Sequence, residues 1–444
     1  MRKLLLTATI LTVLAAPAFA KPYLDIREIH TKGGLTAWMV NDKTIPIFAL
    51  KFSVKGGAQN DPQGKEGLTE LLSSTLDEGA GARDSETVQN ALDANGIRMG
   101  FNATRDRFVG SLKTTTAHQD LAVALFDDAL NRPHFARDAV ERMKQAILSN
   151  QRFEKADPNW LAGKALFETL FPGQPYGRTV DGSEESIKSL TTDDLKTYRP
   201  QTFCKDDLKI AVVGDIAPDK AEAMIDKVFG AWPTCGDVNS APEVDPVNLG
   251  KRVDVPWQGA QSVVLMAQPG LARQDKDWWA ARILDFGLGG GEFSSRLMDE
   301  VRVKRGLTYG VGTALVPYDL SPLWIVQSGI DAPKTDEALS VIRQIWGDVA
   351  KDGLKDDEIK EAKSYLIGSL PLALTSTDNI AAIVLQLQED GLPMDTLDRR
   401  ADEINAVTVK DVKRVANERL HADQLTTIVV GPQKAAATTD KKKK

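Results

Sequence analysis

Residues 187–216 read IKSLTTDDLKTYRPQTFCKDDLKIAVVGDI, and residues 404–432 read INAVTVKDVKRVANERLHADQLTTIVVGP. Near its start each stretch has a threonine that can cap a helix, followed closely by an acidic residue, and it continues as a short amphipathic helix and a loop. Each then ends in a β-rich run, at residues 208–213 and 425–430. In both runs the last two residues are valines and a glycine follows, which gives the sequence Val-Val-Gly. The two stretches predict two copies of one structural unit.

The regions upstream of these stretches also correspond, because each contains a strand, a helix, a second strand and a second helix in the same order. The predicted pairs are strands 47–54 and 262–267, helices 66–76 and 277–288, strands 108–113 and 323–328, and helices 121–129 and 336–350. We expect an α+β fold of two homologous mixed α/β domains in tandem, each a β-sheet flanked by helices.

The join between the copies is rich in Pro, Asn and Asp and lacks sustained periodicity. We place the first domain at residues 21–238, a linker at 239–250 and the second domain at 251–433. Two similar halves joined in this way commonly face each other like a clamshell, and clefts between domains are favoured binding sites.

The two ends of the chain do not belong to either copy. Residues 1–20, MRKLLLTATILTVLAAPAFA, have the basic start, apolar centre and Ala-Phe-Ala end of a secretory signal peptide. No later stretch is long and apolar enough to span a membrane, so we expect a periplasmic protein with no membrane span after cleavage. Residues 434–444 form a lysine-rich tail that we expect to be disordered.

Composition and cysteine content narrow the possible functions. The formal net charge of −7 argues against a nucleic-acid partner, because no broad basic field is present to meet phosphates. The two cysteines, Cys204 and Cys235, can form a disulfide in an oxidising compartment. The sequence leaves a disulfide and two free thiols as open alternatives.

The histidines do not form a recognisable metal site. The four are His30, His118, His134 and His421, and no two have the i, i+4 spacing that directs two imidazoles from a helix to one ion. The most unusual local sequence is instead Gly289-Gly290-Gly291, which permits close backbone approach. This run is either a flexible joint between two helices or an extended loop against which a peptide can lie.

The segment around this run resembles a known family. Residues 288–309 read LGGGEFSSRLMDEVRVKRGLTY: a glycine-rich turn, then S-S-R-L, then R-x₆-Y. This order resembles the second-half signature of the pitrilysin/insulinase zinc peptidases, family M16. The repeated halves and the Val-Val-Gly strand ends are similar too, so the resemblance covers nearly the whole mature chain.

The resemblance implies that the first half has lost its metal site. Active members carry H-x-x-E-H on a helix, where two His bind zinc and the Glu activates water. At the matching positions this chain has Glu70, Ser73 and Ser74. The third ligand, a Glu on a later helix, is replaced by Ile147 or Leu148, and we expect no metal in this chain.

In the second half the resemblance implies that Arg302 and Tyr309 match the Arg/Tyr pair of active members, which reaches toward the substrate and its oxyanion. Gly289, Gly290 and Gly291 then become candidate substrate contacts. For Arg302 the alternative is a solvated charge on a helix face, because other basic residues lie nearby.

Two functional hypotheses follow from this pattern. In the first, the chain is the non-catalytic subunit of a periplasmic heterodimeric peptidase, and it lends Arg302 and Tyr309 to a homologous partner that carries the zinc and to an unfolded peptide substrate. In the second, it is a catalytically dead peptide-binding or structural scaffold that keeps the M16 fold.

Overall fold

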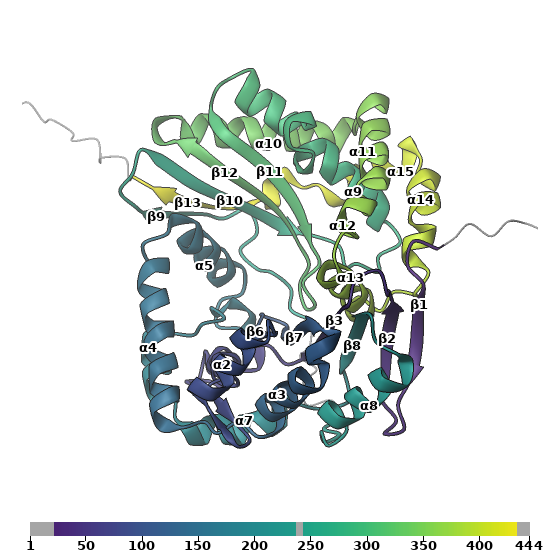
Figure 1. Cartoon of the computed structure of the whole chain (residues 1–444). Helices are drawn as coiled ribbons and strands as arrows, with labels where there is room; N and C mark the ends of the chain where they lie inside the picture. Colours follow the sequence, from purple (N-terminus) through teal and green to yellow (C-terminus); the bar gives the residue numbers. More distant parts are fainter. Residues whose placement is uncertain (1–21, 237–242, 433–444) are drawn as a thin grey trace, which may run out of the picture.

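The computed structural model describes residues 22–236 and 243–432 (Figure 1). The predicted signal peptide and the predicted disordered tail lie outside the described residues, as does the start of the predicted linker. Within these two ranges, none of the helices combines the length and the apolar character needed to cross a membrane.

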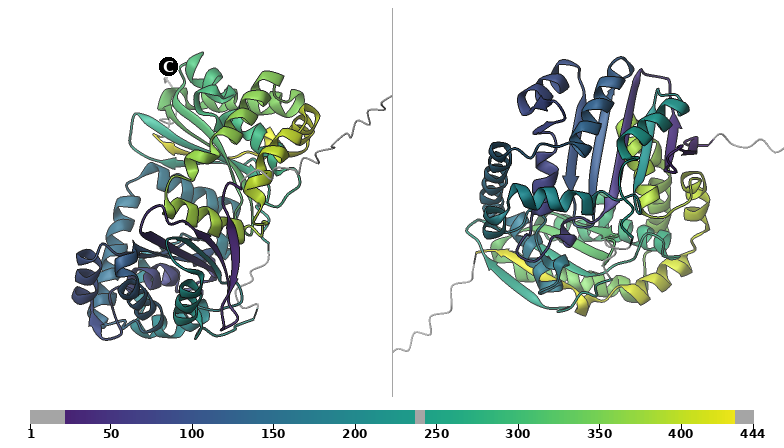
Figure 2. Two further views of the ribbon diagram at one scale, coloured as in Figure 1. Left: turned by 45° about the vertical axis from the view of Figure 1, so that its right-hand side comes forward. Right: turned by 90° about the horizontal axis from the view of Figure 1, so that it is seen from below.

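The chain folds into two halves, each built on one mixed β-sheet, and Figure 2 shows the halves stacked on one another from two further sides. The first sheet has the strand order β1 (Ile26–His30), β2 (Thr36–Asn41), β8 (Lys209–Gly214), β3 (Ile47–Lys55), β7 (Arg107–Thr115) and β6 (Arg98–Ala103). The second has the order β9 (Arg252–Pro256), β13 (Thr426–Gly431), β10 (Gln261–Pro269), β12 (Leu323–Asp331) and β11 (Thr308–Val316). A separate two-stranded ribbon consists of β4 (Gly79–Ala80) and β5 (Arg83–Asp84).

The two sheets have the same topology. From β2 to β6 the first sheet matches the second from β9 to β11, strand for strand, and β1 is an additional edge strand. The pairs β2–β8 and β9–β13 are parallel, and the other pairs in both sheets are antiparallel. The fold predicted from the internal repeat, two mixed α/β domains in tandem, is therefore confirmed.

Helices cover both sheets. Those of the first half are α1 (Leu68–Thr75), α2 (Ser85–Ala94), α3 (Gln119–Asn131), α4 (Arg137–Glu154), α5 (Pro158–Leu170), α6 (Glu184–Ser189), α7 (Thr192–Thr202) and α8 (Pro218–Phe229). Those of the second half are α9 (Trp278–Asp285), α10 (Thr335–Asp352), α11 (Asp356–Gly368), α12 (Leu370–Ala373), α13 (Thr377–Glu389), α14 (Thr396–Ala406) and α15 (Val409–Arg419).

The capping pattern of the repeated stretch is present in both halves. The Thr191 side chain caps α7, and Asp194 accepts from the Thr191 backbone N–H in return. Thr408 and Asp411 form the same reciprocal pair at α15. Each box satisfies N–H groups that a helix start otherwise leaves without a partner. The sequence repeat thus corresponds to a repeat in local structure.

Each half also covers the sheet of the other half with one helix. α13 packs on β3 and β8 (Figure 1). In this layer Val384 and Leu385 belong to the same buried cluster as Ala49 and Val213. Helix α5 packs reciprocally on β10 and β13 of the second half. Because the central strands have a helix layer on each face, their runs are apolar on both faces, as in residues 210–213 and 428–430.

A buried ion pair also connects the two halves. Arg107, 7% exposed, lies on β7 of the first half. Its guanidinium donates to Asp207 in the same half and, at 3.0 Å, to Asp319 in the second half. The two halves are therefore joined by an apolar layer on two sheets and by a buried charge.

The two cysteines form a disulfide. Cys204 follows α7 and Cys235 follows α8, and their Cα atoms are 5.8 Å apart. This resolves the alternatives left open by the sequence. The bond fixes the chain shortly before it leaves the first half.

Candidate functional site

The three positions of the degenerate metal motif lie on α1 and point to no common ion. The hydroxyls of Ser73 and Ser74 donate to the Glu70 carbonyl oxygen of their own helix, at 2.8 and 2.9 Å. Burial raises the pKa of the Glu70 carboxyl, and the Asp181 carboxylate adds to the effect. Two back-bonded serines and a carboxyl that favours its proton do not form a zinc ligand set.

The position predicted for a third ligand is apolar in the structure. Ile147 and Leu148 on α4 are both buried in the core of the first half. Glu141, earlier on the same helix, is exposed and accepts a hydrogen bond from Gln145. The predicted position therefore supplies no carboxylate, and the Glu141 carboxylate is turned to the surface.

Sequence reasoning missed two acidic residues that lie close to Glu70. Glu154 ends α4, and Asp181 lies in the loop before α6. Burial and the Asp181 carboxylate raise the pKa of Glu154 to about 7. Glu154 Oε2 and Asp181 Oδ2 are both buried without a hydrogen-bond partner among the described residues. Neither residue belongs to a motif, and 27 positions separate them in the sequence, so no local pattern predicts that they meet.

These carboxyl groups do not replace the lost zinc site. Within residues 22–236 and 243–432, no group of three or more His, Cys, Asp or Glu side chains is arranged to hold a metal ion. Neighbouring carboxyls with raised pKa values share protons more readily than they coordinate a cation without imidazole donors. The residues present therefore do not fit the zinc ion of the family's active members.

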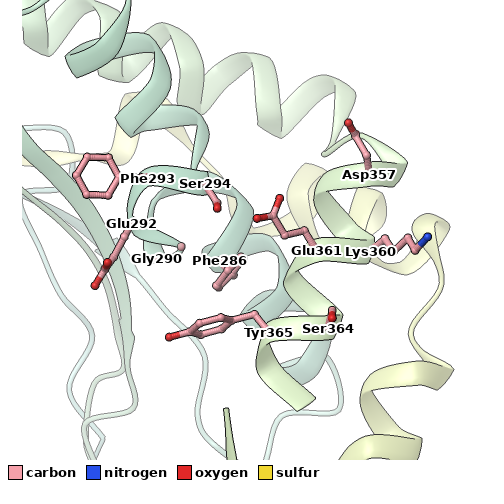
Figure 3. Close-up of a pocket in the computed structure, with 11 residues that line it drawn as sticks. Phe286, Gly290, Glu292, Phe293, Ser294, Asp357, Lys360, Glu361, Ser364 and Tyr365 are labelled. Carbon is pink, nitrogen blue, oxygen red and sulfur yellow. The ribbon is translucent and has the colours of Figure 1, made fainter. Parts of the chain in front are cut away.

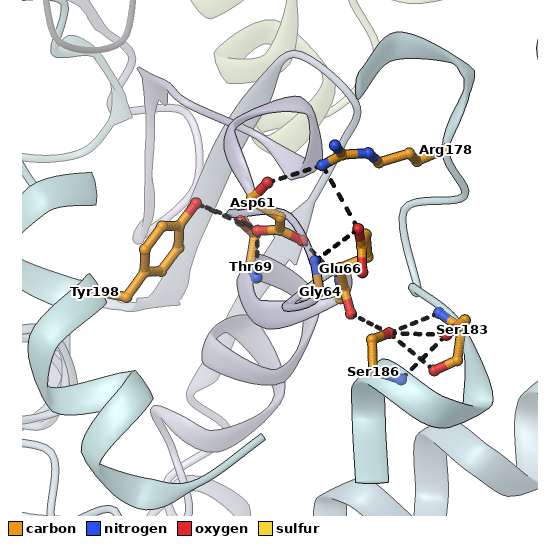
Figure 4. Close-up of polar contacts among 9 residues, drawn as sticks. Asp61, Gly64, Glu66, Thr69, Arg178, Ser183, Ser186 and Tyr198 are labelled. Atoms are coloured by element: carbon orange, nitrogen blue, oxygen red, sulfur yellow. Dashed lines mark hydrogen bonds and ion pairs between the residues drawn. The ribbon is translucent and has the colours of Figure 1, made fainter. Parts of the chain in front are cut away.

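The start of α1 is nevertheless held firmly by a network around Asp61 (Figure 4). Asp61 accepts from the backbone N–H groups of Gly67 and Thr69, at 2.7 and 3.0 Å, and from the Thr69 hydroxyl at 2.6 Å. The Tyr198 hydroxyl, on α7, lies 2.9 Å from the Thr69 hydroxyl. Gly67 has a φ of 87°, and a Cβ there would lie 2.7 Å from the Asp181 carbonyl oxygen, so only glycine fits. Hydrogen bonds anchor the helix at its first turn.

The glycine run of the second half has a different form from either one expected. Phe286–Gly290 is a π-helical turn that continues directly from α9, and Glu292–Ser294 is a short 3-10 turn. A Cβ on Gly289 would lie 2.5 Å from the Thr313 side chain on β11, so glycine permits close packing there. Of the two forms that the sequence left open, the extended loop is therefore wrong. The helix predicted at 277–288 is α-helical only to Asp285 and continues as the π-helical turn, because the glycines let the helix widen and press against the sheet. Substrate contact by Gly289, Gly290 and Gly291 stays a prediction.

The basic residues after this turn differ in their partners. Arg296 forms a two-pronged pair with Glu358, Lys304 pairs with Asp299 and Glu300, and Arg305 pairs with Glu300.

Arg302 is the exception in this segment. It lies on the π-helical segment Met298–Val303, and its guanidinium stacks 4.8 Å from the centre of the Phe293 ring. It forms no ion pair with the described residues. Stacking on Phe293 orients the guanidinium, and the lack of an ion pair leaves its donors available to a ligand.

Tyr309 projects outward because the strand that carries it is irregular. The register of β11 against β12 shifts between Thr308 and Gly310, which places Tyr309 in a β-bulge. The Thr308 hydroxyl pins the bulge, because it donates to the Gly329 carbonyl oxygen and accepts from the Gly310 N–H. Tyr309 is 67% exposed, and its hydroxyl has no hydrogen-bond partner in the described part of the chain. Bulges of this kind re-aim side chains at binding sites.

A cavity of about 710 Å³ lies between the glycine turn and α11 (Figure 3). Phe293, the ring on which Arg302 stacks, also lines this cavity. Glu292 has a φ of 48°, which is uncommon for a residue other than glycine. Sequence reasoning did not predict this cavity, because its second wall comes from residues 357–365.

Comparisons with known proteins agree with this architecture. A family model described as Insulinase (Peptidase family M16) matches residues 37–184, and one described as Peptidase M16 inactive domain matches residues 189–366. The chain is 27% identical to an uncharacterized zinc protease of Streptomyces coelicolor, over 92% of this chain and 90% of that protein. It is 22% identical to the non-peptidase homolog YmxG of Helicobacter pylori, over 98% of this chain and 99% of that protein.

A solved structure shows the same fold. The crystal structure of a peptidase M16 inactive domain from Pseudomonas fluorescens superposes with a TM-score of 0.86 at 27% identity, over 93% of this chain and 99% of that one. The adjoining family models, the long sequence matches and this superposition together show that the chain belongs to peptidase family M16, as a homologue of the inactive type.

Proposed function

We propose that this chain is the non-catalytic subunit of a two-chain M16 peptidase in the periplasm, and that a homologous partner carries the zinc. One contrast supports the proposal. Among the described residues, the first half has no metal ligand set, whereas Arg302 and Tyr309 of the second half both carry donors without a partner. A chain that has lost the family's zinc ligands thus keeps the groups that a shared site requires.

The two side chains suit the stabilisation of negative charge on oxygen. A guanidinium and a phenol both donate hydrogen bonds, and neither has to break an internal bond first. Phe293 supports the Arg302 guanidinium from one side, and the bulge fixes the direction of Tyr309. Donors held in advance where charge develops are worth more than donors that must reorganise.

The sheets offer a way to hold an unfolded peptide. β6 and β11 are the last strands of their sheets, so each presents one backbone edge that no described strand covers. An extended peptide can add to such an edge through main-chain hydrogen bonds. β11 begins with the Tyr309 bulge, so its edge adjoins one of the two candidate donors, whereas β6 packs beside α1 and the degenerate metal motif.

The alternative function, a catalytically dead scaffold, requires only the fold. Arg302 keeps its donors free and stacked on Phe293, whereas Arg296, Lys304 and Arg305 have carboxylate partners; a shared site uses such free donors, and a scaffold does not need them. The pairing pattern therefore favours the shared site.

Mixing experiments test the proposal. The purified chain is combined with a zinc-bearing M16 homologue from the same organism, and cleavage of an unfolded peptide is measured for each chain alone and for the mixture. We expect activity to require both chains and zinc, and zinc analysis of this chain alone to give a value near zero. Full activity of the partner alone, or proteolysis by this chain alone, contradicts the proposal.

A further inference from the structure

The cavity between the glycine turn and α11 has an aromatic lining. In Figure 3, Glu292 and Phe293 lie on one side and Glu361 and Tyr365 on the other, with Phe286 between them. The Phe286 and Tyr365 rings are 4.8 Å apart, and Tyr365 and Phe293 are both largely exposed. Three aromatic side chains thus line a concave site together with charged and hydroxyl groups, and concave sites with aromatic walls and polar groups are typical of ligand binding.

The charged groups of the cavity are mainly acidic, because Glu292, Asp357 and Glu361 outnumber Lys360. Glu292 and Glu361 form no ion pair or side-chain hydrogen bond with the described residues, and both line the cavity. The Glu361 carboxylate points toward the glycine turn, whereas the Lys360 ammonium on the same helix points away from it (Figure 3). The interior therefore presents aromatic faces and unpaired carboxylates, but no inward-pointing cation.

This combination matches a long cationic side chain. The methylene stem of a lysine or arginine packs on aromatic faces, and its charged end interacts with ring faces and carboxylates. An acidic side chain would be repelled, and a short apolar one would leave the carboxylates unpaired.

We propose that this cavity is a subsite for a lysine or arginine side chain of the bound peptide. The inference rests on the proposed function, because Phe293 both lines the cavity and supports Arg302. A peptide whose backbone oxygen meets Arg302 therefore places a neighbouring side chain at the mouth of the cavity. The subsite adds a substrate preference to the shared site.

Binding of labelled peptides to the isolated chain tests the subsite without a partner. Two unfolded peptides are compared by fluorescence anisotropy: one carries lysine at a central position, and the other carries norleucine, which has a similar stem and no charge. We expect the wild-type chain to prefer the lysine peptide by about tenfold. The double variant Glu292→Gln, Glu361→Gln should lose this preference.

Two further variants keep the test sharp. Glu337→Gln removes the same charge from an exposed position outside the cavity and should leave the preference intact. Glu361→Lys should instead favour a glutamate peptide, and this exposed substitution leaves the core unchanged.

The possible results separate the two proposals. Equal binding of the lysine and norleucine peptides to the wild-type chain overturns the subsite, and so does a preference that survives in the double variant. The shared-site proposal is judged separately, by whether mixing with the partner produces activity.

Discussion

Thr69→Val is the substitution that best tests how α1 keeps its position without a metal. Thr69 is fully buried, and its hydroxyl donates to the Asp61 carboxylate at 2.6 Å. Losing a hydrogen bond to a charged group costs about 1.5–3 kcal/mol. The added methyl returns up to about 1 kcal/mol through apolar burial. We expect a net loss of about 1–2 kcal/mol in the free energy of unfolding at pH 7.

The effect should depend on pH in a defined direction. Burial raises the pKa of Asp61 from its ordinary value near 3.8 to about 6, so this group's contribution to stability is complete below about pH 4 and is lost as the pH rises through 6. The Thr69 hydrogen bond lowers the pKa of Asp61, so its removal raises that pKa further. The gap between the wild-type chain and Thr69→Val should therefore widen as the pH rises through 6.

Urea unfolding followed by circular dichroism measures both effects. Thr75→Val is the matched control, because Thr75 is buried on the same helix, but its hydroxyl only donates to carbonyl oxygens of the preceding turn. We expect this control to change the free energy of unfolding by less than about 0.5 kcal/mol. Equal losses for the two variants, or a gap that narrows with rising pH, would refute the role given to the Asp61 network.

Three further predictions concern other parts of the molecule. Because burial and Asp181 raise the pKa of Glu154 to about 7 from 4.5, wild-type stability falls as the pH rises from about 4.5 through 7. Glu154→Gln should make the melting temperature less dependent on pH over that range, and an unchanged profile contradicts this. Leu385→Ala on α13 should lower the free energy of unfolding by about 2–4 kcal/mol and weaken the protection of β3 and β8, in the other half, against hydrogen exchange. A loss of protection confined to the second half argues against the packing of α13 on the first sheet. Reducing the Cys204–Cys235 bond removes a loop constraint worth about 3–4 kcal/mol, so dithiothreitol should lower the urea midpoint; an unchanged midpoint contradicts this.

The repeat made the core of the fold predictable. Strands 47–54 and 262–267 are β3 and β10 in the structure, and their ends agree within one or two residues. Both were predictable because each is itself a run of alternating or continuous apolar residues. The helix caps at Thr191 and Thr408 were equally visible, since capping depends on neighbouring residues.

Features that depend on tertiary contacts were not predictable. The apolar stripes of α5 and α13 show that each helix is buried, but a stripe does not reveal that the helix covers the sheet of the other half. The bulge at Tyr309 arises from pairing with β12, which no pattern within β11 specifies. The motif indicated Arg302 and Tyr309, whereas their unpaired state became visible only in the structure.

The most direct test of the central claim compares kcat of the reconstituted two-chain enzyme for Arg302→Ala and Arg305→Ala. Arg305 lies three positions later and already pairs with Glu300, so it controls for the lost charge. We predict that Arg302→Ala lowers kcat roughly 10²–10³-fold, as expected for an oxyanion donor, and that Arg305→Ala changes it little. An Arg302→Ala enzyme with the wild-type kcat would contradict the claim that this chain lends its donors to the partner's site.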